Sequence, residues 1–161
     1  MEEIDKLRKQ LAAHLSGRGA HIDFDAAVVD FPFELTGKHP PNLAHTAWQL
    51  VFHLWTAQED ILEFCRGPGH VSPEYPSGYW PNDPQPADVE QWHLTIESFA
   101  RDLHAMIDLV EDPGNDLFTP FPHGSGQYLL REAILLIDHN SYHIGQLVDI
   151  RMLLGVPVRD W

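Results

Sequence analysis

Four stretches of the sequence repeat apolar residues with the period of an α-helix, and this pattern restricts the fold more than any other feature. Apolar residues spaced three and four apart form one stripe of a helix, and that stripe must be buried. The stretches cover residues 2–16, 42–65, 87–111 and 126–154. No segment shows the convincing alternation of a β-strand. The sequence therefore predicts an all-α fold, a four-helix bundle.

Residues that start or stop helices flank these stretches. Asn42 follows two prolines and is a favourable N-cap residue, while Gly67 and Pro68 end the second stretch. The third stretch stops before Pro113, and the fourth ends at Gly155, a favourable C-cap residue. These signals predict the helix boundaries given above.

Two long connections join the first three predicted helices. Residues 66–86 hold six prolines among glycine, serine and asparagine, which excludes a helix or a central strand there. A helix of about 24 residues spans roughly 36 Å, and about 20 extended residues reach farther. We expect this loop to return along the whole bundle, so that the second and third helices run parallel. Residues 17–41 form the other long connection, in which 22–35 predict a short extra helix.

Length, charge and cysteine content limit the classes of function. We expect residues 1–161 to form a single domain, because this length can bury a sizeable core. A formal net charge of −14 argues against a nucleic-acid partner and against an anionic membrane surface. The single cysteine, Cys65, excludes an internal disulfide, and neither a signal peptide nor a membrane span is evident. These features predict a cytoplasmic enzyme or binding protein.

Two histidines lie on the apolar face of the last predicted helix. His139 and His143 are separated by only about 40° in helical projection, and Leu136, Leu147 and Ile150 fall on the same side. Both imidazoles should therefore point into the core. Neutral imidazole is the commonest metal ligand among side chains, so the pair suggests a metal site. Two buried histidines that bind only neighbouring polar groups would give the same pattern.

A third inward-facing histidine would favour the metal. His53 lies in the middle of the second predicted helix, as His139 and His143 do in the last, so antiparallel packing of the two helices would bring all three together. His45 lies near the end of its helix and is expected to cap it or to face solvent. His123 precedes the last helix and is the only loop histidine that could bend into a pocket mouth.

Two familiar metal motifs do not apply. The helical His-Glu-x-x-His motif of zinc proteases needs a glutamate as general base, but Asn140 follows His139. Di-iron carboxylate bundles need two inward-facing Glu-x-x-His motifs, and this sequence has one, Glu90 to His93, whose histidine faces away from the apolar stripe.

Several stretches of the chain do resemble a known family. The segment Asp138-His-Asn-Ser-Tyr-His-Ile-Gly-Gln146 is preceded by Asp116-Leu-Phe-Thr-Pro-Phe-Pro-His-Gly-Ser-Gly-Gln127. Earlier, His45-Thr-Ala-Trp-Gln-Leu-Val-Phe-His53 is followed by Ala57-Gln-Glu-Asp-Ile-Leu-Glu-Phe64. Together they resemble the DinB-like (damage-inducible) superfamily of metal-binding four-helix bundles, and the resemblance covers nearly the whole chain.

The resemblance implies both a topology and a metal site. The bundle should have up-down-down-up connectivity, and a divalent metal should be bound by His53, His139 and His143. Members of the superfamily include thiol-dependent transferases that use bacillithiol or mycothiol, and relatives such as maleylpyruvate isomerase, and homodimers are common. We therefore expect a homodimer and a small-molecule substrate, with a low-molecular-weight thiol as one candidate. Zn or Ni is the favoured metal, with Fe and Mn as alternatives.

Three neutral ligands would leave one coordination position open, which is typical of a catalytic metal site. We expect a metal-dependent enzyme that transfers thiols, with metal-dependent hydrolysis or a non-catalytic, metal-stabilised stress-response protein as alternatives. Other side chains should hold each imidazole by its second nitrogen. The candidates for this role, or for lining the pocket, are Glu132, Gln146, Gln49 and Asp60. The aromatic-rich loop 75–80 could cover the site.

Overall fold

The fold is a bundle of four long α-helices, as the sequence predicted. The computed structural model describes residues 3–17 and 19–158, and no β-strand occurs among them. The long helices are α1 (Glu3–Leu15), α3 (Ala47–Arg66), α4 (Val89–Glu111) and α5 (Leu129–Leu153). Between them lie the short helix α2 (Phe24–Val28) and the 3-10 turns η1 (Phe33–Leu35) and η2 (Ser77–Tyr79). The short helix α2 falls inside the segment for which an extra helix was predicted.

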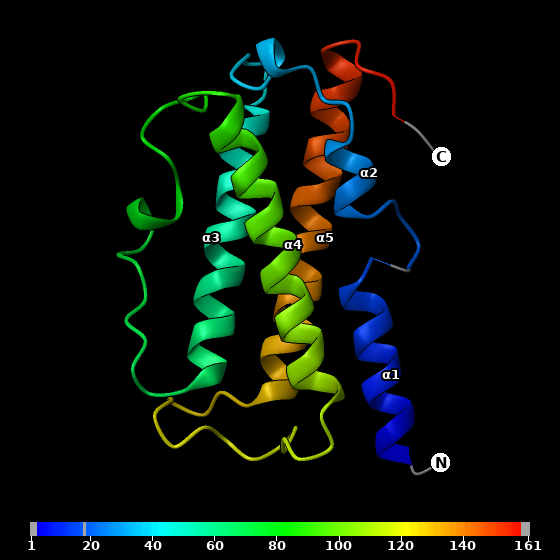
Figure 1. The fold of residues 1–161 in the computed structure, drawn as a ribbon, viewed down its shortest axis with the longest axis vertical. Helices are drawn as coiled ribbons and strands as arrows, with labels where there is room; N and C mark the ends of the chain where they lie inside the picture. Colours follow the sequence, from blue (N-terminus) through cyan, green and yellow to red (C-terminus); the bar gives the residue numbers. More distant parts are fainter. Residues whose placement is uncertain (1–2, 18, 159–161) are drawn as a thin grey trace.

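In chain order, the four long helices run up, down, down and up. In Figure 1, α1 rises, α3 and α4 both descend, and α5 rises again. The loop of residues 67–88 climbs back along α3, so that α4 starts at the same end of the bundle as α3 (Figure 1). The predicted return of this loop is confirmed. As a result α5 runs antiparallel to α3 and packs against it.

The second long helix starts later than the sequence suggested. Its N-cap is Thr46, whose hydroxyl accepts a hydrogen bond from the backbone N–H of Gln49, while the Gln49 side chain accepts one from the Thr46 backbone. This reciprocal pair satisfies two N–H groups that the helix itself leaves unbonded. Asn42, the predicted cap, lies outside the helix and has a positive φ of 66°.

Two apolar clusters fill the bundle, one above the other. The upper cluster includes Leu50, Leu54, Phe99, Ile144 and Leu147. The lower cluster includes Leu62, Met106, Val110, Ala133 and Leu136. Two fully or almost fully buried amides, Gln58 and Asn140, occupy positions along α3 and α5 between the members of these clusters. The core therefore has a polar layer at mid-height.

Two buried arginines fasten irregular segments to the helices. Arg151, which is 1 % exposed, donates hydrogen bonds to the carbonyls of Ala27, Val29 and Pro157. Arg8 donates in the same way to carbonyls at the end of α4 and in the loop after it. Buried carbonyls need donors, so each guanidinium stabilises segments where a helix ends and irregular chain begins.

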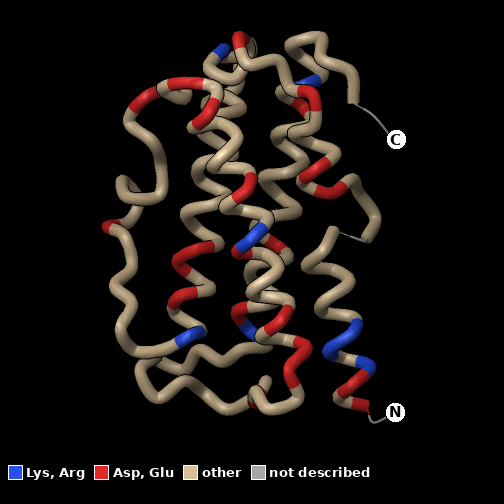
Figure 2. The backbone as a smooth tube through the Cα atoms, in the orientation of Figure 1, with Lys and Arg blue, Asp and Glu red and all other residues tan. Residues whose placement is uncertain are grey.

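Acidic side chains are more numerous than basic ones. Asp and Glu occur on every long helix and number 24 against 10 Lys and Arg, of which Lys6, Arg8 and Lys9 lie close together on α1 (Figure 2). No helix in the described part of the chain combines the length and the apolar character needed to cross a lipid bilayer.

Replacing Arg151 by methionine should destabilise the protein strongly. The substitution keeps most of the side-chain length but removes the donors to several carbonyls, and we expect the free energy of unfolding to fall by about 3 kcal/mol. Urea unfolding followed by circular dichroism measures this. The control is Arg66→Met, which removes an exposed ion pair with Glu63 and should change stability by less than about 1 kcal/mol. Equal effects of the two substitutions would contradict the assigned role.

Candidate metal centre

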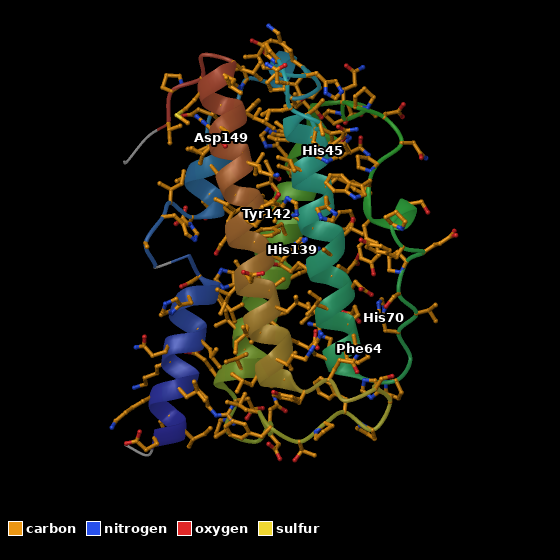
Figure 3. The ribbon with its side chains drawn as sticks, turned by 180° about the vertical axis from the view of Figure 1, so that it is seen from behind. His45, Phe64, His70, His139, Tyr142 and Asp149 are labelled. Carbon is orange, nitrogen blue, oxygen red and sulfur yellow. The ribbon has the colours of Figure 1, made fainter. Side chains whose placement is uncertain are left out.

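Three histidines converge where α3 packs against α5. His53 comes from α3, and His139 and His143 come from successive turns of α5. One ring nitrogen from each lies within 4.8 Å of those of the other two. The Nε2 atoms of His53 and His139 are 3.1 Å apart. Figure 3 shows His139 between the two helices, seen from behind the bundle. The structure thus brings together the three histidines that the sequence singled out.

The outer nitrogens of two rings are held by oxygen acceptors. Nδ1 of His53 donates to the backbone carbonyl of Tyr79 at 3.1 Å. Nδ1 of His143 donates to Oε1 of Gln146 at 2.7 Å. A neutral imidazole carries one proton, so donation from Nδ1 leaves Nε2 with a free lone pair. Both rings are therefore oriented to offer Nε2 as a ligand atom.

The three imidazoles are kept neutral by their surroundings. Burial, with smaller contributions from the neighbouring histidines, lowers the pKa of His53 from 6.5 to about 4, against an opposing effect of its hydrogen bond to the Tyr79 carbonyl. Burial and the nearby His143 lower the pKa of His139 to about 4, against a smaller opposing effect of Asn140. Burial also lowers the pKa of His143. Metal ligation requires the neutral ring, so this environment favours the ligating form at physiological pH.

An aromatic ring from the long loop covers one side of the site. The ring of Trp80 stacks on His53, with 3.9 Å between centroids and 5° between planes. The same indole stacks on His45 at 4.1 Å and 12°. His45, expected to cap the helix or to face solvent, is instead half-buried against this indole. Loop 75–80 therefore lies against the histidine cluster.

One carboxylate fastens that loop to α3. Asp60 accepts hydrogen bonds from Nε2 of His70 at 2.6 Å and from the hydroxyl of Tyr79 at 2.7 Å. The backbone carbonyl of Tyr79 is the group that binds His53. Asp60 thus acts on His53 through the loop, and its own hydrogen bonds go to His70 and Tyr79.

The other residues that the sequence suggested near the metal site lie at different distances from the three histidines. Gln146 binds a ring of the cluster directly. Gln49 is engaged in the capping box at the start of α3. Glu132 is buried, forms an ion pair with Arg131, and lies two turns below His139 among residues of the lower cluster. His123 binds the carbonyl of Phe64 near the end of α3, away from the three histidines.

Sequence analysis missed three groups near the site. The Tyr79 carbonyl gives no sequence signal, because every residue has one. Gln58 and Asn140, the buried amide pair, were missed because their contact depends on how α3 and α5 are aligned. The burial of Gln58 could have been predicted, because it lies one turn from Leu54 and one turn from Leu62, on the buried face of its helix.

Comparison with known protein families identifies the family of the chain. Residues 18–147 match the family model of the DinB superfamily. The chain belongs to the DinB superfamily. Comparisons with curated proteins and with solved structures found no match. In this DinB-superfamily protein the cluster His53, His139 and His143 has donors that fit a divalent transition metal, because neutral imidazole nitrogens are ligands for such ions.

Acid should destabilise the metal-free protein through these histidines. In the unfolded chain they take up protons near pH 6.5, whereas His53 and His139 in the folded chain resist protonation until about pH 4. The unfolded state therefore binds more protons in this interval, and stability falls as the pH decreases from 6.5 to 4.

Urea unfolding in the presence of a chelator at several pH values tests this. The variant His139→Gln lacks one of the titrating groups, so its loss of stability between pH 7 and 4.5 should be smaller than that of the unchanged protein. Parallel pH profiles for the two proteins would show that the buried ring does not contribute.

Proposed function

We propose that this DinB-superfamily protein binds a divalent transition metal through His53, His139 and His143 and catalyses the transfer of a low-molecular-weight thiol to an electrophilic substrate. The convergence of three neutral imidazoles from two helices carries the proposal. Within the described residues, no carboxylate or cysteine belongs to this group, which would leave a bound ion with open positions. Zn or Ni suits such a set of nitrogen donors, and Fe or Mn is the alternative.

The surroundings of the site favour a thiol over water as the nucleophile. The hydrogen-bond partners of the three rings are a backbone carbonyl, an amide side chain and another ring of the cluster, so no carboxylate is hydrogen-bonded to them in the described part of the chain. A free thiol has a pKa of about 8.5 and water one of about 15.7, so a thiol needs much less help to ionise. When bound, the metal supplies the positive charge that stabilises the anionic form of the thiol.

The thiol would have to come from a second substrate. The protein's own thiol, Cys65, lies near the far end of α3, and burial together with the charge of Glu132 raises its pKa to about 12. It is therefore protonated at neutral pH and not a nucleophile. In the proposed reaction the external thiol loses its proton to solvent, its sulfur forms a bond to carbon, and the leaving group departs with the electron pair.

A cavity on the outer face of α5 adjoins two residues that contact His143, although none of the three histidines lines it. It has a volume of about 710 Å³ and lies between loop residues 19–22 and the outer face of α5. Tyr142 and Gln146 both line it and both contact His143, the aromatic ring at 4.9 Å between centroids and the amide by its hydrogen bond. Tyr142 is well exposed (Figure 3) and is free to pack against a bound molecule.

Loss of any one of the three histidines should abolish tight metal binding while the helices remain. We expect His53→Ala, His139→Ala and His143→Ala each to weaken Zn²⁺ binding by at least 100-fold, because two ligands remain and the apolar packing of α3 on α5 is retained. Elemental analysis of untagged protein and competition with a chelator measure this. The control is His93→Ala, an exposed position on α4, which should leave metal binding unchanged.

The thiol-transfer activity should depend on the same residues. Metal-loaded protein incubated with a low-molecular-weight thiol and a panel of electrophiles should consume the thiol, and His139→Ala should not. Cleavage of esters or amides without thiol consumption would favour the hydrolase. A melting temperature that rises with metal while neither reaction occurs would favour the non-catalytic stress-response protein.

A further inference from the structure

The polar layer inside the bundle is a chain of hydrogen bonds with a fixed direction. Gln58 is fully buried, and its Nε2 donates to the backbone carbonyl of Phe99 at 2.6 Å. A carbonyl can only accept, so this contact determines which end of the Gln58 amide carries the oxygen. The oxygen then accepts a hydrogen bond from Nδ2 of Asn140 at 3.1 Å. The orientation of the Asn140 amide follows from the Phe99 carbonyl.

This orientation leaves one oxygen without a donor. Asn140 is 6 % exposed, and its Oδ1 has no hydrogen-bond partner of acceptable geometry in the described structure. Nδ1 of His139, the next residue toward the N-terminus, is buried and lacks such a partner as well. The two side chains interact with each other. Two adjacent residues thus hold an unbonded acceptor and an unbonded ring nitrogen that can carry a proton.

The position of the single proton on His139 decides which contact is made. His53 already donates from Nδ1, so its Nε2 is a bare acceptor 3.1 Å from Nε2 of His139. A proton on Nε2 of His139 satisfies His53 but leaves Oδ1 of Asn140 without a donor. A proton on Nδ1 gives Asn140 its donor and leaves Nε2 of His139 bare. One neutral ring cannot do both.

We propose that Asn140, oriented by Gln58 and the Phe99 carbonyl, is a positioning residue that holds the proton of His139 on Nδ1 and so presents its Nε2 to the metal. The inference rests on the proposed metal site. It would give all three rings the same arrangement, because Tyr79 and Gln146 already offer an oxygen to Nδ1 of the other two. Partners of this kind orient metal-binding histidines and fix their tautomer.

Substitution of Asn140 by leucine removes the acceptor and should act on the metal site from inside the core. We expect the affinity for Zn²⁺, measured by chelator competition, to fall by about 10–100-fold. Asn140→Asp keeps an oxygen toward His139 and should retain affinity within a few-fold, even if it unfolds more easily. The control is Thr95→Val, which removes another buried polar group, bonded within its own helix, and should leave affinity unchanged.

Nitrogen-15 NMR of the histidine rings in metal-free protein reports the tautomer of His139. A purely structural role of Asn140 would not change this tautomer. The resonances of His139 are identified by their loss in His139→Gln. They should report a proton on Nδ1 in the unchanged protein and on Nε2 in Asn140→Leu. Asn140→Ala replaces the leucine variant if that does not fold.

The outcomes separate this inference from the proposed function. If the unchanged protein does not bind Zn²⁺, the metal proposal fails, and the tautomer comparison alone decides the role of Asn140. If Zn²⁺ binds but Asn140→Leu alters neither affinity nor tautomer, the positioning role is overturned. It is also overturned if aspartate and leucine at position 140 lower the affinity equally.

Discussion

The antiparallel packing of α3 against α5 is the constraint on which the rest of the structure depends. It places the middle of one helix opposite the middle of the other, so that His53 meets His139 and His143. Apolar residues above and below this level carry the packing, and a polar layer lies between them at mid-height. Buried polar groups are costly unless they are hydrogen-bonded, so a polar layer here must be satisfied almost completely. The long loop 67–88 follows from the same arrangement, because α4 must start beside the start of α3.

Much of the fold could be predicted because helical periodicity and helix-breaking residues are local signals. The stretch rich in proline could only be a connection, and its length implied that it crosses the bundle. The predicted start of α3 was wrong because Asn42 and Thr46 are both favourable N-cap residues, and the prediction chose Asn42. Gln49, three residues after Thr46, completes a capping box and marks the true start. That signal was present in the sequence, but Gln49 was assigned to the histidines instead.

The three histidines could be selected from the sequence because the direction in which a residue points from its helix, and its position along the helix axis, can both be calculated. Their supporting groups depend on alignment between elements, which a single sequence does not encode. The carbonyl of Tyr79 reaches His53 from a loop that Asp60 fastens through the Tyr79 hydroxyl. Gln146 was predictable because it lies three residues from His143 on the same helix. Glu132 lies two turns from His139, too far along the axis to bind its ring.

The acceptors around the cluster also bear on its chemistry. Tyr79 and Gln146 offer neutral oxygens, as Asn140 does in the proposed arrangement, whereas a carboxylate in any of these places would add negative charge beside the ligands. Three neutral rings with neutral partners would leave the charge of a divalent ion uncompensated locally, while the chain as a whole carries a formal charge of −14. An acidic protein attracts cations over long range, but this site would retain its full attraction for an anion at close range. That combination suits a substrate that becomes anionic only when it is bound, and a thiol is such a substrate.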